Sequence, residues 1–280
     1  MAASELGTRQ ELSMTSLRKP NSLTRIRAIA VNAFRESVRD RVLYNLILFV
    51  LILVGASIFI SELSIDQETK FIASLSLSLM LVFGALIAIF IGVGLVYKEI
   101  DKRTIYNLLS KPVHRHEFII GKYLGLCLTL LVNLLVMVAG TELALLYVSK
   151  SFGALHLSIL PTAYLIFLEL AVTIAVALMF SSFSTPMLSA LFSFAVYVIG
   201  NFSNDLKLAA DLSESAVTRA ILIGLYYVMP NFSNFSFISQ ASYGQLPPAK
   251  MLLTSTVYAV IYISILISAA VLIFQKRNFK

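Results

Sequence analysis

Residues 71–97 read FIASLSLSLMLVFGALIAIFIGVGLVY, and this stretch decides the fold class. It contains 27 residues and no Asp, Glu, Lys, Arg or His. About 20 apolar helical residues cross the roughly 30 Å hydrocarbon core of a bilayer, so the stretch predicts a transmembrane helix. The whole chain has the same character, because 58% of its 280 residues are hydrophobic and 13% are charged. A soluble domain carries about 25% charged residues, so we predict an all-α membrane protein.

Similar apolar runs lie on both sides of this stretch, and together they predict six transmembrane helices. Their expected ranges are 42–61, 71–97, 121–148, 158–181, 186–203 and 251–274. A further apolar segment, 217–230, is too short to span and ends at Pro230. Backbone groups in hydrocarbon need internal partners, so we expect this segment to be a partly buried or re-entrant element sheltered by the other helices.

The N-terminal 41 residues divide into two parts. Residues 1–21 are polar and are interpreted as a disordered cytosolic tail, whereas residues 22–280 are interpreted as one six-helix transmembrane domain. Within residues 22–41, SLTRIRAIAVNAFRESVRDR, apolar side chains recur at helical spacing and arginines fill the positions between them. This pattern predicts a basic amphipathic helix that lies flat at the headgroup surface. The alternative is a solvated helix that leads into the first span.

Basic residues are distributed unevenly between the predicted loops. With a cytoplasmic N-terminus, seventeen of the 22 Lys and Arg residues fall on the cytoplasmic side: eight before the first span, six around the loop after the second and three at the C-terminus. This positive-inside bias predicts a multi-pass protein of the cell (inner) membrane with both termini in the cytoplasm. It also accounts for the net charge of +7, so no nucleic-acid partner is expected.

The loop after the second span carries the most informative pattern. Residues 97–125 read YKEIDKRTIYNLLSKPVHRHEFIIGKYLG. Over 98–110, apolar and charged residues are spaced as in a short amphipathic helix. Pro112 stops that helix. Such a helix, projecting into the cytosol, suits docking in the groove of a partner protein. An ordinary basic loop is the alternative.

This loop resembles the signature E…R/G-T-[IL]…LL-x-x-P-[VI]-x-R-x-E-[FL]…G-K of ABC-2-type transporter permeases. The matching residues are Glu99, Arg103, Thr104, Ile105, Leu108, Leu109, Pro112, Val113, Arg115, Glu117, Phe118, Gly121 and Lys122. The resemblance implies a connecting helix at the amphipathic start and a coupling helix in the loop after the second span. It also implies a transporter of two membrane subunits, which we expect to be identical, and two separate ATP-binding subunits. The residues expected to dock the ATP-binding subunit are Glu99, Asp101, Arg103, Thr104, Ile105, Leu108 and Leu109.

The chain lacks the motifs of an ATPase or a hydrolase. It has no GxxxxGK[ST] phosphate-binding loop, so we expect it to bind no cofactor itself, with ATP and Mg²⁺ held by the partner subunit. There is also no His/Cys cluster with metal-ligand spacing and no convincing Ser/His/Asp arrangement, so no metal site and no catalytic residues are expected.

Two carboxylates fall inside predicted spans, Glu142 toward the outer end of the third and Glu169 near the middle of the fourth. Ionisable groups within a membrane are costly, which makes both candidates for a transport path, where they would contact each other, a cation or cargo. Alternatively, each is protonated or bonded to a polar neighbour such as Asn133 or Thr173.

The function predicted from these features is that of the permease subunit of an ATP-driven ABC transporter, with export favoured by the resemblance. One rival is an ion-coupled secondary carrier that uses Glu142 and Glu169, although no paired broken helices in matching halves are visible. The other is a non-transporting membrane component of an ABC-like complex.

Overall fold

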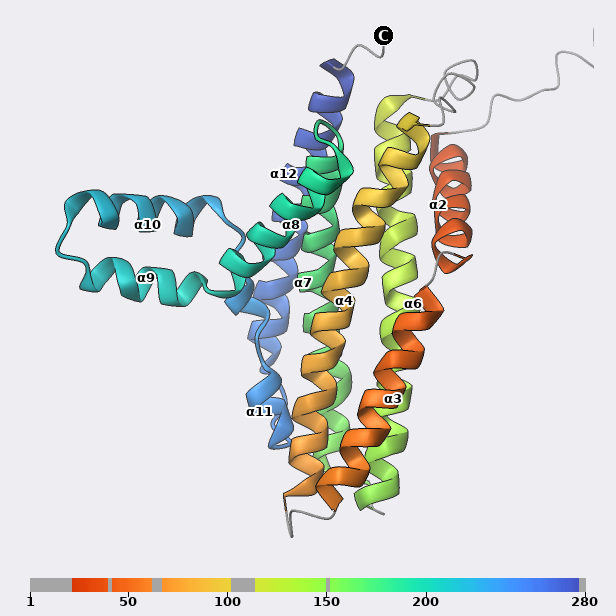
Figure 1. The fold of residues 1–280 in the computed structure, drawn as a ribbon, viewed down its shortest axis with the longest axis vertical. Helices are drawn as coiled ribbons and strands as arrows, with labels where there is room; N and C mark the ends of the chain where they lie inside the picture. Colours follow the sequence, from red (N-terminus) through yellow and green to blue (C-terminus); the bar gives the residue numbers. More distant parts are fainter. Residues whose placement is uncertain (1–21, 40–41, 62–66, 102–113, 150–151, 277–280) are drawn as a thin grey trace, which may run out of the picture.

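The computed structural model describes residues 22–39, 42–61, 67–101, 114–149 and 152–276. These residues form a bundle of long helices from which one helical hairpin projects sideways (Figure 1). Within the described ranges there is no strand, and the all-α membrane fold is confirmed. In chain order the elements are α2 (Ser22–Arg39), α3 (Val42–Ser61), α4 (Glu68–Asp101), α6 (Arg115–Ser149), α7 (Ala154–Ser181), α8 (Pro186–Asn201), α9 (Ser203–Leu212), α10 (Ala216–Val228), η1 (Phe232–Phe235), α11 (Ile238–Ser242) and α12 (Ala249–Lys276).

Four described helices are long and apolar enough to cross a membrane. These segments are Glu68–Gly94, His116–Ser149, Ala154–Ser181 and Ala249–Gln275. They match four of the six predicted spans; Glu68–Gly94 begins three residues before its predicted range and has the same length of 27 residues, whereas the other three are longer than predicted. These helices extend further because the polar residues at their ends do not interrupt the backbone hydrogen-bond ladder.

The other two predicted spans, 42–61 and 186–203, also correspond to helices. α3 covers 42–61, and its described apolar part is Leu46–Ala56. α8 has 16 residues, or about 24 Å of helix, and turns by 65° into α9. A second bent pair joins α10 to residues Phe232–Ser242 at 46°. The described chain therefore has four to six candidate spans, depending on whether each bent pair counts as one.

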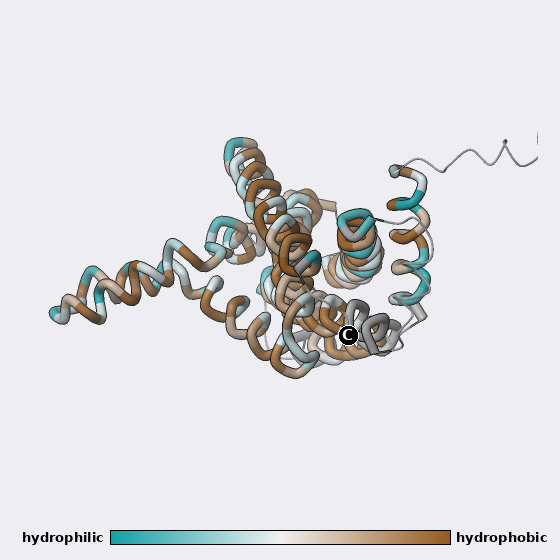
Figure 2. The backbone as a smooth tube through the Cα atoms, turned by 90° about the horizontal axis from the view of Figure 1, so that it is seen from above, coloured by the Kyte–Doolittle hydropathy of each residue, from teal (hydrophilic) through white to brown (hydrophobic). Residues whose placement is uncertain are grey.

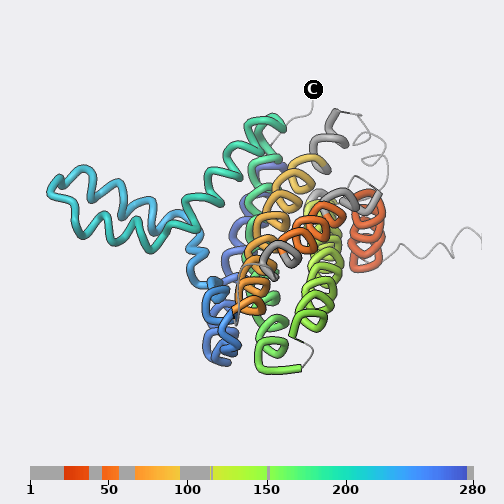
Figure 3. Tube along the Cα trace, turned by 60° about the horizontal axis from the view of Figure 1, so that its bottom comes forward, coloured from red at the N-terminus to blue at the C-terminus, as the bar shows by residue number. Residues whose placement is uncertain are grey.

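The helix most enclosed by the bundle is α7. It packs against α4, α6, α8 and α12, and 78% of its most apolar window is buried. In Figure 3, α3 lies against α4 and α6 on the outside of this arrangement. Small and branched side chains such as Ala171, Val172 and Ala175 let the surrounding helices approach α7 closely.

α2 packs along the first turns of α6, beside the bundle (Figures 1 and 2). The approach is close because Gly121 and Gly125 face it: a Cβ on Gly125 would lie 2.5 Å from the Ala30 carbonyl oxygen. Ala33 and Ser37 are consequently buried. Residues Ser22–Arg39 form a helix in the structure, and part of its apolar face meets α6. A position at the headgroups stays a prediction.

Three chain segments meet at one end of the bundle. Ser22 at the start of α2 contacts Glu117 in α6, and Phe118 stacks on Phe274 near the end of α12 with ring centroids 6.0 Å apart. The beginning of α2, the beginning of α6 and the end of α12 thus share one side, as the predicted topology requires.

Most of the segment predicted as a sheltered or re-entrant element, 217–230, lies in α10 outside the bundle. α10 has no buried residue, and with α9 it forms a hairpin that leaves the bundle sideways (Figure 1). The prediction that other helices of the same chain shelter residues 217–230 is therefore wrong. We call residues 203–228, the hairpin of α9 and α10, the arm.

Candidate functional site

The predicted docking residues fall around the end of α4. Glu99 and Asp101 belong to the last turn of α4, which continues through the position where the sequence predicted a new helix to begin. Arg103, Thr104, Ile105, Leu108 and Leu109 lie outside the described residues. Their docking role stays a prediction.

Glu117 fixes the start of α6, and His114 is the residue that precedes this helix. The His114 backbone N–H donates a hydrogen bond to Glu117 Oε2 at 3.1 Å. A glutamate that reaches back three residues to the residue before a helix satisfies a donor that the helix leaves unpaired. Its negative charge also suits the positive end of the helix dipole. The fully buried Glu117 therefore sets the point at which the predicted docking loop becomes α6.

The second oxygen of the same carboxylate holds α2. Ser22 Oγ donates to Glu117 Oε1 at 2.5 Å, and Arg25 Nη2 donates to it at 3.0 Å. Three donors from two segments of chain thus converge on one buried carboxylate. Burying a charge is costly unless it is paired and hydrogen-bonded, and Glu117 meets both conditions.

Lys122 forms a second joint between α6 and α2, one turn further along. Its side chain is 1% exposed, and its Nζ lies 3.6 Å from Glu36 Oε2. The ammonium also lies 5.7 Å from the centroid of the Phe118 ring, within the range of a cation–π contact. We call Ser22, Arg25, Glu36, Glu117 and Lys122 the α2–α6 clamp.

Glu117 and Lys122 both match the permease signature within residues 97–125. The sequence alone indicated no structural role for them. Two signals in the sequence point to the clamp. Gly121 and Gly125 stand four residues apart, the spacing that allows two helices to approach closely. Glu117 stands three residues after the residue that precedes α6, which is the capping-box position.

Glu169 lies inside the bundle, between α7 and α8. The residue is 3% exposed, and Asn201 Nδ2 donates to its Oε1 at 3.2 Å. The suggested partners have other contacts: Thr173 donates to the backbone oxygen of Glu169, and Asn133 donates to that of Thr129. The carboxylate is therefore hydrogen-bonded to the last residue of α8.

Glu142 is paired near the C-terminal end of α6. Its Oε2 lies 2.6 Å from His156 Nδ1, and the imidazole stacks on Phe152 with ring centroids 4.6 Å apart. His156 falls between the predicted spans 121–148 and 158–181, whereas in the structure it is 5% exposed in the first turn of α7. Since His156 and Glu169 are 13 residues apart in α7, about 20 Å of helix lies between them. The structure does not bring Glu142 and Glu169 together.

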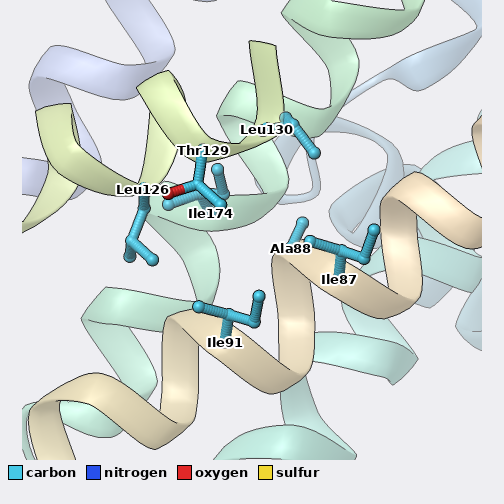
Figure 4. Close-up of a pocket in the computed structure, with 7 residues that line it drawn as sticks. All are labelled: Ile87, Ala88, Ile91, Leu126, Thr129, Leu130 and Ile174. Atoms are coloured by element: carbon cyan, nitrogen blue, oxygen red, sulfur yellow. The ribbon is translucent and has the colours of Figure 1, made fainter. Parts of the chain in front are cut away.

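The interior space seen between α4, α6 and α7 is small. Figure 4 shows apolar side chains such as Ile91, Leu126 and Ile174 around a void of about 10 Å³, which matches one water molecule. A larger, open groove of about 620 Å³ lies where η1 meets the N-terminal end of α12, lined by Asn234, Lys250 and Tyr258 among others.

Metal chemistry has no support in the described residues, where no three His, Cys, Asp or Glu side chains gather as metal ligands. The arrangement instead has a buried clamp that joins the beginning of α6 to α2.

A family model described as "ABC-2 family transporter protein" matches residues 27–279, nearly the whole chain. The chain belongs to the ABC-2 transporter family. It is an ABC permease, the membrane component of such a transporter, and the resemblance of the loop after the second span is confirmed at the level of the family. Family members of this type lack an ATPase motif of their own and generally work with an ATP-binding subunit. No match is found among curated proteins.

Proposed function

We propose that this ABC-2 permease exports its cargo with energy from a separate ATP-binding subunit that docks on the loop between α4 and α6. The observation that carries the proposal is the position of Glu117. One carboxylate oxygen accepts from His114, the first described residue after that loop, and the other accepts from Ser22 and Arg25 of α2. A displacement of the loop would reach two helices through a single side chain.

The proposed complex contains two copies of this chain in the cell (inner) membrane, with both termini in the cytoplasm. ATP and Mg²⁺ would bind to the partner subunits, in keeping with the absence of a phosphate-binding loop from this sequence. The docking surface would consist of Glu99, Asp101, Arg103, Thr104, Ile105, Leu108 and Leu109. Export, rather than import, follows the family resemblance.

A native pull-down tests the proposal. The chain carries a C-terminal tag, is extracted from its host in mild detergent, and its partners are identified by mass spectrometry. The proposal expects an ATPase with a phosphate-binding loop at a one-to-one ratio, lost when residues 99–109 are altered. Absence of any ATPase, under conditions that preserve other membrane complexes, would refute docking.

Coupling is tested by substitutions in the same loop. Charge reversal at Glu99 or Arg103, or helix disruption by Ile105→Pro, should leave ATP hydrolysis running without transport. Arg219→Glu serves as the matched control, since it reverses an exposed charge on the arm. Tightly coupled transport in the loop variants would sink the docking proposal.

The ion-coupled carrier is a weaker candidate. It requires carboxylates along one path, yet about 20 Å of α7 separates Glu169 from the His156 that pairs with Glu142. Transport in vesicles that contain an ion gradient and no ATP would favour this rival.

A further inference from the structure

The open groove between η1 and α12 is walled by both elements. Ser233 and Asn234 of η1 line one side, and Lys250, Thr254 and Tyr258 of α12 line the other. Its volume of about 620 Å³ lies within the roughly 300–1,000 Å³ of sites that hold small organic ligands. The groove is therefore large enough for the polar part of a lipid or for another small molecule.

Hydrogen bonds fix the two walls to each other. Ser255 Oγ donates to the Asn234 carbonyl at 2.8 Å, and the Asn231 backbone N–H donates to Tyr258 OH at 2.8 Å. The centroid of the Tyr258 ring also lies 5.9 Å from that of Phe235, which is 1% exposed. The groove is consequently a feature of the packed fold.

The groove follows the first turns of a membrane-spanning helix. The apolar span of α12 begins at Ala249, so Lys250 lies at its boundary, whereas Tyr258 lies about 12 Å further along the helix. Asn234 lies between these levels, because its carbonyl meets Ser255. In Figure 1, α12 begins at the end of the bundle opposite the C-terminus. One groove thus reaches from the boundary of the span to the depth of its third turn.

Hydrogen-bond donors line the groove at each of these levels. Within the described residues, the Lys250 ammonium makes no ion pair and the Asn234 side-chain amide makes no hydrogen bond. Tyr258 OH accepts from Asn231, and no acceptor for its own proton lies in the described part of the chain. No Asp or Glu is among the described residues that line the groove. A positive charge and two neutral donors without a carboxylate favour a ligand that is anionic and rich in oxygen.

The surroundings of the groove are apolar. Leu253 and Val257, which adjoin Thr254 and Tyr258 in α12, are 68% and 52% exposed. Hydrocarbon offers no acceptor to the Tyr258 proton, so a polar group has to enter the groove at that depth. A phospholipid supplies its phosphate at the boundary of the span, its ester carbonyls deeper and its acyl chains against the apolar surface. A free phosphate ion would reach Lys250 but leave Tyr258 without an acceptor.

We propose that this groove binds one anionic phospholipid, whose phosphate meets Lys250 and Asn234 and whose ester carbonyl accepts from Tyr258. Basic side chains at the membrane boundary attract anionic headgroups in the same way. This inference goes beyond the proposed function. It assigns a lipid site at the end of the bundle opposite the α2–α6 clamp, and it needs no ATP-binding subunit.

Native mass spectrometry of the full-length permease tests the site. Protein stripped of lipid by detergent exchange is titrated with phosphatidylglycerol, and the fraction that retains lipid is measured. The proposal expects one tightly held lipid per chain. Lys250→Gln and Tyr258→Phe should each raise its apparent Kd about fivefold or more, the effect of one lost hydrogen bond.

Two matched controls leave the groove intact. Arg219→Gln removes an exposed charge from the arm, and Tyr227→Phe removes a hydroxyl from a side chain that is 79% exposed there. Both should bind the lipid like the parent protein. A cooperative thermal transition shows that each of the four variants is folded.

Three results would overturn the site. The first is equal binding of phosphatidylglycerol by the parent and both groove variants, which would place the lipid elsewhere. The second is equally tight binding of phosphatidylcholine, which would remove the role of the negative charge. The third is displacement of the lipid by millimolar inorganic phosphate, which would indicate a site for a free anion.

Discussion

The Arg25 guanidinium donates a hydrogen bond to Glu117 Oε1 at 3.0 Å, although the two residues are 92 positions apart. The carboxylate is buried and the guanidinium is 20% exposed at the edge of the bundle. Because Ser22 and His114 supply further hydrogen bonds, the ionised Glu117 is well satisfied only while α2 stays against α6. The contact makes α2 part of the bundle at the end where three chain segments meet.

Removal of Arg25 should loosen α2. Arg25→Ala takes the charged partner from a buried carboxylate, and we expect a loss of about 1–3 kcal/mol in stability. Hydrogen exchange over residues 22–37 should accelerate first, and thermal unfolding in detergent should shift to lower temperature. Arg27→Ala is the control, because Arg27 is exposed on the same helix. Equal exchange rates in the two variants would refute the role of the clamp.

The close approach of α2 depends on Gly125. In Gly125→Ala the new Cβ would lie 2.5 Å from the Ala30 carbonyl oxygen and 2.6 Å from Ala33 Cβ. Neither backbone nor Cβ has room to rotate away, so α2 must move outward at a cost of about 1–3 kcal/mol. Thermal unfolding and protection of residues 22–37 report the change.

Gly94→Ala is the matched control for that substitution. A Cβ at Gly94 meets nothing within 4 Å, and alanine favours a helix over glycine by about 1 kcal/mol. The control should therefore be neutral or stabilising. If Gly125→Ala behaves in the same way, the helices are not in contact as described.

The long spans could be predicted because their signal is local. An unbroken apolar run such as 71–97 needs no knowledge of its neighbours to be recognised as a membrane helix. The partner of α2 could not be predicted in this way. Amphipathic spacing shows which face of a helix is apolar, but lipid and the glycine-lined side of α6 both satisfy that face.

The polar contacts within the bundle also depend on tertiary arrangement. Asn201 reaches Glu169 because α8 ends against the middle of α7, and 32 residues separate the two in sequence. The direction of the arm is another case, since it follows from the bend after Asn201 and from the fit of Gly200 on Pro230. The sequence of a short apolar helix such as α10 reveals its length and amphipathicity, but not its direction relative to the bundle.

Asn201 should prove important for stability. In Asn201→Leu the Glu169 carboxyl loses the side-chain donor that α8 supplies, and we expect unfolding to become easier by about 1–3 kcal/mol. Glu169→Gln should be milder, because the amide oxygen still accepts from Asn201. The thermal unfolding temperatures of the two variants and of the parent protein give the order of their stabilities. A Glu169→Gln variant less stable than Asn201→Leu would contradict the proposed role of the hydrogen bond at this position.

Glu142 and His156 should behave as a coupled pair that joins α6 to α7. Their atoms lie 2.6 Å apart, and the imidazole is almost fully buried while the carboxylate side chain is 24% exposed. A double-mutant cycle with Glu142→Gln and His156→Gln should give an interaction energy of about 0.5–3 kcal/mol. The control cycle combines Glu142→Gln with Asp211→Asn on the arm and should be additive within about 0.5 kcal/mol. Additivity in the first cycle would mean that the pair contributes nothing to the contact between α6 and α7.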